Sequence, residues 1–120
     1  MNQTALPTPN RERLPNRHAC EVVEFEMGGR PFIAHIGRFD DDRLGEIFVS
    51  SGKAGSEMEV LMRDAAIVLS VALQSGVDAA DIRKSLTRNP NGSASGPVGK
   101  ILDILASDAR KKKANEQPIA

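Results

Sequence analysis

The fold is decided by residues 20–49, CEVVEFEMGGRPFIAHIGRFDDDRLGEIFV. This stretch contains three runs in which apolar and polar side chains alternate, the pattern of β-strands with one buried face. Two turn signals separate the runs: Gly28-Gly29, where both residues tolerate positive φ, and the polar triplet 40–42. We therefore predict an antiparallel meander with strands at 20–27, 30–39 and 44–49.

The alternation also predicts which side of each strand is buried. The expected inner residues are Val23, Phe25 and Met27 in the first strand, Phe32, Ala34 and Ile36 in the second, and Ile47 and Val49 in the third. The opposite face carries Glu24, Glu26 and Glu46, which are interpreted as solubility groups rather than as an acid–base pair.

After the third strand, apolar residues recur at intervals of three and four, which is the spacing of one face of a helix. Ser56 and Glu59 form a capping box, and Gly76 fits a left-handed helix stop, so we predict a helix from 56 to about 74. The residues expected to form its buried face are Met58, Leu61, Met62, Ala65, Leu69, Ala72 and Leu73.

Two shorter helices are predicted downstream. The first begins at Asp78 and ends near Leu86, and residues 87–96 form a loop rich in turn formers. The next begins at Pro97, and its buried stripe is Val98, Ile101, Leu102 and Leu105. Strands followed by helices indicate an α+β fold: a three-stranded antiparallel meander followed by three helices packed on one face, rather than a βαβ nucleotide fold.

Charge is unevenly distributed along the 120 residues, although the formal net charge is zero. Residues 20–76 hold ten acids and five bases, whereas both ends are basic. We predict a disordered lead at 1–10, a single domain at 11–106, and a basic disordered tail at 107–120. The basic ends are read as solvated termini or, alternatively, as an arm that contacts a phosphate-bearing partner through Arg11, Arg13 and Arg17.

The composition excludes several classes of protein. One cysteine allows no intrachain disulfide and no thiolate zinc cluster, and no apolar stretch is long enough to cross a membrane. Neither a signal core nor a cysteine framework marks secretion, so a cytoplasmic location is expected. Four phenylalanines are the only aromatic residues, so few side chains could stack on nucleic-acid bases.

The most specific chemical feature is the glycine-bearing loop at 52–56, GKAGS, which enters the long helix. The helix N-terminus favours anions, so Gly52, Lys53, Gly55 and Ser56 form a candidate phosphate site. The spacing differs from that of a Walker A loop. The alternative interpretation is a plain strand-to-helix turn.

Other reactive side chains do not assemble into a catalytic set. His18 and His35 are not joined to a nucleophile by any motif, and Cys20 is interpreted as a small half-buried residue. The acidic triplet at 40–42 reads as a solvated turn rather than a cation site. We therefore expect a chain that is non-catalytic on its own, with no metal site.

Three stretches together carry a family resemblance: GEIFV at 45–49, GKAGS at 52–56 and SVALQSGV at 70–77. Over about residues 11–105 the chain resembles the TSCPD domain, found at the C-terminal end of adenosylcobalamin-dependent ribonucleotide reductases and in short stand-alone relatives. The resemblance implies an association with nucleotide reduction, and hence with deoxyribonucleotide synthesis and DNA replication.

The chain departs from the family at its name-giving motif. Thr-Ser-Cys-Pro-Asp falls on 94–98, ASGPV, so that the cysteine is replaced by Gly96. The resemblance does not extend to the large barrel domain in which the family enzymes bind adenosylcobalamin and carry out the radical chemistry. The resemblance therefore implies no cofactor of its own.

Besides a complete small enzyme, two functions remain open. One is an accessory or regulatory domain, stand-alone and non-catalytic, that binds a nucleotide, a phosphate or a reductase-like partner. The alternative is a nucleic-acid-binding or protein-interaction module, of the kind found in phages, that uses the basic N-terminal arm. A homodimer formed by pairing at the edge of the third strand is a further expectation.

Overall fold

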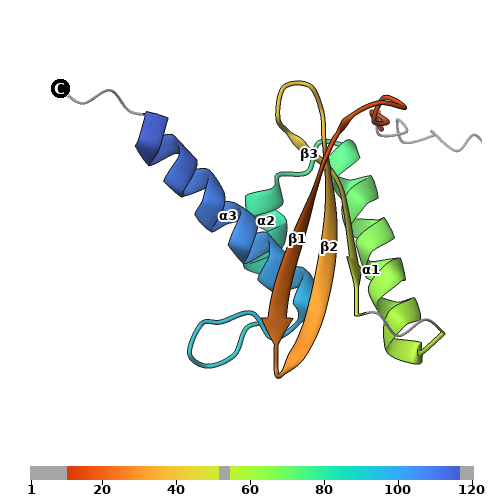
Figure 1. The fold of residues 1–120 in the computed structure, drawn as a ribbon, viewed down its shortest axis with the longest axis vertical. Coiled ribbons are helices and arrows are strands. Elements are labelled where there is room, and N and C mark those ends of the chain that lie inside the picture. The colour runs from red at the N-terminus through yellow and green to blue at the C-terminus, as the bar shows by residue number, and fades with distance from the viewer. Residues whose placement is uncertain (1–10, 52–54, 117–120) are drawn as a thin grey trace, which may run out of the picture.

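The structure is a computed structural model and describes residues 11–51 and 55–116. Three strands precede three helices in the chain (Figure 1). Their bounds are β1 Ala19–Met27, β2 Arg30–Arg38, β3 Leu44–Ser50, α1 Glu57–Gln74, α2 Ala79–Ser85 and α3 Pro97–Glu116. The predicted α+β fold is confirmed.

The sheet is an antiparallel meander in the order β1-β2-β3. The β1–β2 turn has φ of 58° at Gly28 and 77° at Gly29, values that glycine reaches without steric cost. Between β2 and β3 the register shifts at Gly37 and Arg38, because Arg38 pairs with Leu44 while Gly37 pairs with Glu46. This irregularity lies at the same end of the sheet as the N-terminal residues described below.

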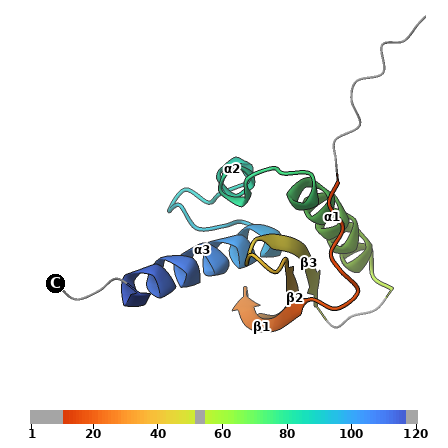
Figure 2. The same ribbon diagram turned by 90° about the horizontal axis from the view of Figure 1, so that it is seen from above.

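The core lies between the inner face of the sheet and the helices, which all lie on one side of it (Figure 2). Its largest fully buried side chains are Ile36 from β2, Ile47 from β3 and Ile101 from α3. The inward residues predicted for the strands all belong to this core or pack against it. The period-2 pattern therefore identified the correct face of each strand.

The predicted buried face of α1 is partly wrong. Met58 and Leu61 are 47 % and 70 % exposed, whereas Ala66, which was not predicted, is fully buried. Three polar residues of α1 are also buried: Glu59, Ser70 and Gln74. The helix is thus rotated from the expected orientation.

The cause of this rotation is the outer edge of β3. The backbone N–H of Ile47 donates to Ser70 Oγ at 3.1 Å, and Gln74 Nε2 donates to the carbonyl oxygen of Gly45 at 2.8 Å. Polar side chains of α1 therefore satisfy strand groups that a fourth strand would otherwise bind. The edge that the sequence suggested for pairing between two copies is covered by α1.

The end of α3 differs from the prediction. A disordered tail was expected from Ser107, but α3 continues as a helix to Glu116. Residues 106–116 are rich in alanine, lysine and arginine, which are strong helix formers, and extending an existing helix requires no new nucleation. The last turns extend away from the sheet (Figure 1). No helix among the described residues combines the length and the apolar character of a membrane span.

Candidate functional site

The candidate phosphate loop is described only in part. Gly52 and Lys53 lie outside the described residues, while Gly55 has φ of 84° and Ser56 is the N-cap of α1. The Glu59 backbone N–H donates to Ser56 Oγ at 3.1 Å, which is one half of the predicted capping box.

Carboxylates already occupy the first turn of α1. Glu57 and Glu59 both lie there, and Glu59 is only 8 % exposed. The Glu59 carboxylate accepts hydrogen bonds from the backbone N–H and the hydroxyl of Ser51, at 3.5 and 3.4 Å. These negative charges interact with the helix dipole and would repel a phosphate at the same place. Phosphate binding by this loop stays a prediction, and the described charges weigh against it.

The basic N-terminal arm, residues 11–18, lies against the body. Arg11 Nε donates to Gln74 Oε1 at 2.7 Å, and the Glu12 backbone N–H donates to the Gln74 carbonyl at 2.8 Å. Leu14 lies against Gly37 and Gly45, where an added Cβ would come within 3.1 and 2.8 Å of its side chain. The two glycines therefore provide the space into which Leu14 packs.

His18 attaches the other end of this arm. Its Nδ1 lies 2.7 Å from the Pro15 carbonyl oxygen, and its Nε2 lies 3.5 Å from a Glu46 carboxylate oxygen. The side chains of Arg13 and Arg17 are exposed. Of the three predicted arm residues, Arg11 is thus engaged within the chain and the other two face solvent.

The remaining candidates are scattered over the surface. His35 is exposed on the outer face of the sheet, as are Glu24 and Glu26. Cys20 is exposed rather than half-buried as predicted. Within residues 11–51 and 55–116, no three His, Cys, Asp or Glu side chains are grouped so that they could hold a metal ion.

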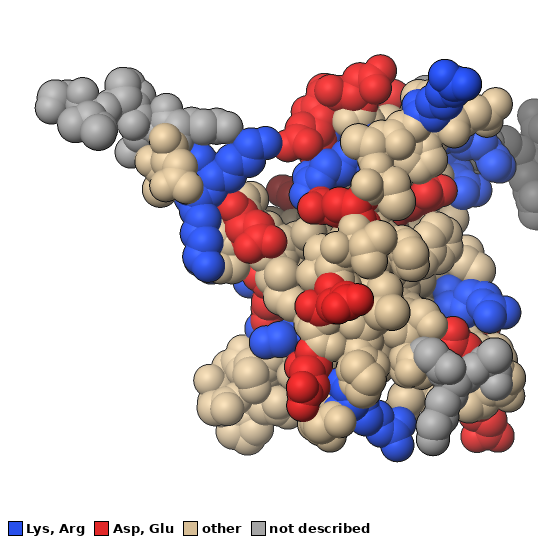
Figure 3. All heavy atoms as spheres, in the orientation of Figure 1, with Lys and Arg blue, Asp and Glu red and all other residues tan. Residues whose placement is uncertain are grey.

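Two residues of the acidic triplet 40–42 form ion pairs with basic side chains. Arg43 Nε lies 2.6 Å from Asp41 Oδ2, and this hydrogen bond lowers the pKa of Asp41. Asp42 lies 3.6 Å from Lys112 of α3. On the face seen in Figure 3, acidic side chains lie over the sheet and basic side chains lie mainly around its margin.

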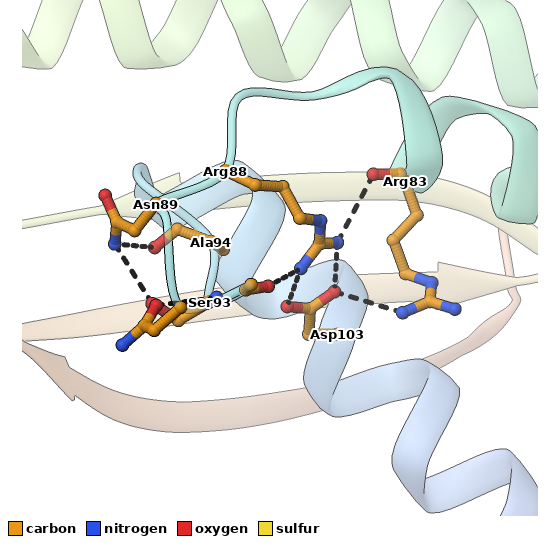
Figure 4. A network of polar contacts seen from close by, with 8 residues as sticks. Arg83, Arg88, Asn89, Ser93, Ala94 and Asp103 are labelled. Carbon is orange, nitrogen blue, oxygen red and sulfur yellow. Dashed lines mark hydrogen bonds and ion pairs between the residues drawn. The ribbon is translucent and has the colours of Figure 1, made fainter.

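A cluster of two arginines around Asp103, which the sequence did not predict, fastens the α2–α3 loop (Figure 4). Arg88 forms a bidentate pair with Asp103, at 2.6 and 2.8 Å, and Arg83 adds a contact at 3.2 Å. Arg88 Nη1 also donates to the Gly92 carbonyl at 3.0 Å. The cluster is structural, because its charges are directed at one another and at the loop backbone.

This cluster makes stability depend on pH. Arg88, and then Arg83, donate hydrogen bonds to Asp103 that outweigh partial burial and lower its pKa. The cluster's stabilisation is therefore complete above the unfolded carboxyl pKa of about 3.9 and is lost as the pH falls through the lower folded value. We expect Asp103→Asn to reduce the free energy of unfolding by about 1.5 kcal/mol at neutral pH. In urea titrations the difference from wild type should shrink below about pH 4.

Asp41→Asn provides the matched control. Its pKa is also lowered, by Arg43, but it is exposed, so its substitution should change stability less. A difference between wild type and Asp103→Asn that is the same at pH 7 and at low pH would contradict this account of the cluster.

An apolar groove lies between α1 and the start of α3. Its volume is about 580 Å³, and the exposed Met58 and Leu61 line one wall. Leu86, Pro97 and Val98 form the other wall, and Phe32 and Met62 also contribute. The lining comes from four separate segments, so no contiguous motif could have revealed it.

Comparison with known proteins identifies the family. The model of the TSCPD domain matches residues 9–107. The chain belongs to the TSCPD domain family. No solved structure matches this TSCPD domain.

The curated relatives are much longer enzymes. The vitamin B12-dependent ribonucleotide reductase of Agrobacterium fabrum is 39 % identical over 67 residues, which are 56 % of this chain and 5 % of the reductase. The enzyme of the same name from Rhodopirellula baltica is 35 % identical over 69 residues, 58 % of this chain and 7 % of the reductase. The TSCPD domain thus corresponds to a small part of these relatives.

The family motif position and the groove coincide. The resemblance places the family motif on residues 94–98, which include Gly96, Pro97 and Val98 of the groove lining. A Cβ added at Gly96 would meet nothing within 4 Å, so a larger residue at this position would project freely. The groove is therefore the described feature most directly connected with the motif.

Proposed function

We propose that this TSCPD domain is a non-catalytic accessory domain that binds a ribonucleotide-reductase-type enzyme. The observation that carries the proposal is the apolar groove, because its lining includes the family motif position and side chains that are exposed without a cover. Exposed apolar patches bordered by polar residues commonly mark protein contacts. Membership of a family whose curated relatives are reductases supports a reductase-type enzyme as the partner.

Vitamin B12 itself is not assigned to this domain. Both histidines of the chain, which could ligate cobalt, lie outside the groove lining, and the groove is lined mainly by apolar side chains. The residues present therefore do not fit a cobalamin site. In this proposal the cofactor belongs to the partner enzyme.

The nucleic-acid alternative has less support. Arg11 is bound to Gln74, and the acidic side chains over the sheet would repel a phosphate backbone. Contacts through Arg13 and Arg17 alone would give weak binding with a shallow dependence on salt.

The proposal is tested by measuring binding to a reductase. Purified vitamin B12-dependent ribonucleotide reductase from Agrobacterium fabrum is titrated with the labelled domain, and fluorescence anisotropy is recorded. We expect saturable binding with a Kd of about 1–10 μM, typical of a modest apolar interface. Moderate salt should weaken binding only a few-fold, because it screens exposed charges but leaves the apolar contact in place. No binding at a hundred-fold higher concentration, or binding that disappears steeply with salt, would contradict the proposal.

A further inference from the structure

Helix α1 has a second apolar stripe besides the one it buries. The stripe consists of Met58, Leu61, Ala65, Val68 and Ala72. Leu61 and Val68 are its most exposed members, at 70 % and 69 %. Successive residues of the stripe are three, four, three and four positions apart, which is the spacing of the a and d positions of a coiled coil.

The stripe forms one wall of the groove described above. Met58, Leu61 and Ala65 line it from α1, and Pro97 and Val98 face them from α3. An exposed heptad stripe beside a second apolar wall is the geometry that accommodates an amphipathic helix. The chemical class of the occupant is thus a helix with its own apolar seam.

The charged residues beside the stripe restrict the kind of helix that can bind there. Glu57 and Asp64 are both exposed and each precedes an a position by one residue, so they occupy successive g positions. Arg30 lies at the N-terminal end, where Nη1 contacts the Met58 sulfur at 3.6 Å. Along the length of the stripe, then, the flanking charges are acidic. Basic side chains at the e or g positions of the occupant would complement them.

We propose that this groove binds an amphipathic helix of another protein, with an apolar a/d seam flanked by lysine or arginine. The inference refines the proposed function, on which it rests for the kind of partner, by specifying the element that the partner presents. A second copy of α1 fits less well. Antiparallel pairing about a two-fold axis would place the acidic g positions of both copies on the same side.

The test uses a defined helical probe rather than a reductase. A 21-residue peptide with Leu at a and d and Lys at e and g is titrated into the domain, beside a twin with Glu at e and g. We expect the Lys peptide to bind at least ~10-fold more tightly. Leu61→Glu should weaken that binding at least ~10-fold.

Val60→Glu is the matched control. Val60 is 50 % exposed on the same helix, about 100° around the axis from Leu61, and receives the same new charge. Val60→Glu should keep the Kd for the Lys peptide within about twofold of the wild-type value. Circular dichroism checks that both variants remain folded.

The outcomes separate the two proposals. Failure of the reductase to bind, with the Lys peptide bound through Leu61, contradicts the proposed function and leaves the helix site intact. Equal binding of the two peptides, equal effects of the two substitutions, or no peptide binding would overturn the helix site. A dimer that light scattering detects and Leu61→Glu abolishes would also overturn it, since it would assign the stripe to a second copy.

Discussion

Replacing Ile101 by alanine is expected to lower the free energy of unfolding by about 3 kcal/mol. Ile101 is fully buried and lies where α3 packs into the core shared by the sheet and α1. Truncation loses the transfer free energy of three carbon atoms and leaves a cavity, since the surrounding backbone belongs to regular elements that collapse little. Urea unfolding followed by circular dichroism measures the change.

Ile104→Ala makes the same truncation one turn along the same helix. Ile104 is only partly buried, so we expect a loss of about 1 kcal/mol. Helix propensity rises equally in the two variants, and their difference therefore reports burial alone. Equal losses would show that α3 does not contribute to the core as described.

Gln74→Ala is expected to lower the free energy of unfolding by about 2 kcal/mol and to loosen the N-terminal arm. Gln74 is 6 % exposed, and its side chain joins two elements to the end of α1. Its Nε2 donates to the Gly45 carbonyl and its Oε1 accepts from Arg11 Nε. Removal leaves a polar group of β3 without this partner at a buried position, which is more costly than the average hydrogen bond.

Hydrogen exchange locates this effect within the molecule. The Glu12 amide, which donates to the Gln74 carbonyl, should exchange at least ~10-fold faster in Gln74→Ala. Arg11→Ala removes the arm contact but keeps the bond to Gly45, so it should accelerate the same exchange with a smaller loss of global stability. An unchanged Glu12 exchange rate in both variants would show that the side-chain contact between Arg11 and Gln74 does not hold the arm.

Strand positions were predictable because one face of each strand is continuously apolar, while the other is mixed and includes Glu24, His35 and Glu46. In β2, Phe32, Ala34 and Ile36 alternate with residues that face outward, and a period of two leaves a single solution. The apolar pattern of helix α1 does not define a single buried face, because apolar residues occupy most of the helix circumference. Its orientation is selected by Ser70 and Gln74, whose hydrogen bonds to β3 depend on contacts far along the chain.

Candidate sites formed by contiguous residues could likewise be predicted from the sequence, whereas sites that join distant segments could not. The GKAGS loop is visible in the sequence because it is contiguous, although part of it lies outside the described residues. The Arg88–Asp103 pair and the apolar groove join segments that are separated along the chain. Exposure of Leu61 was the decisive observation for the groove, and only packing reveals exposure.

The covering of β3 by α1 has a consequence for the behaviour of the protein at high concentration. A sheet polymerises edge to edge only if it is open on both sides, because each added molecule must leave a new edge for the next. Among the described strands, β1 alone has an edge not covered in this way, and it carries Glu21, Glu24 and Glu26. Edge-to-edge association could thus join two molecules at most, and charge repulsion opposes even that step.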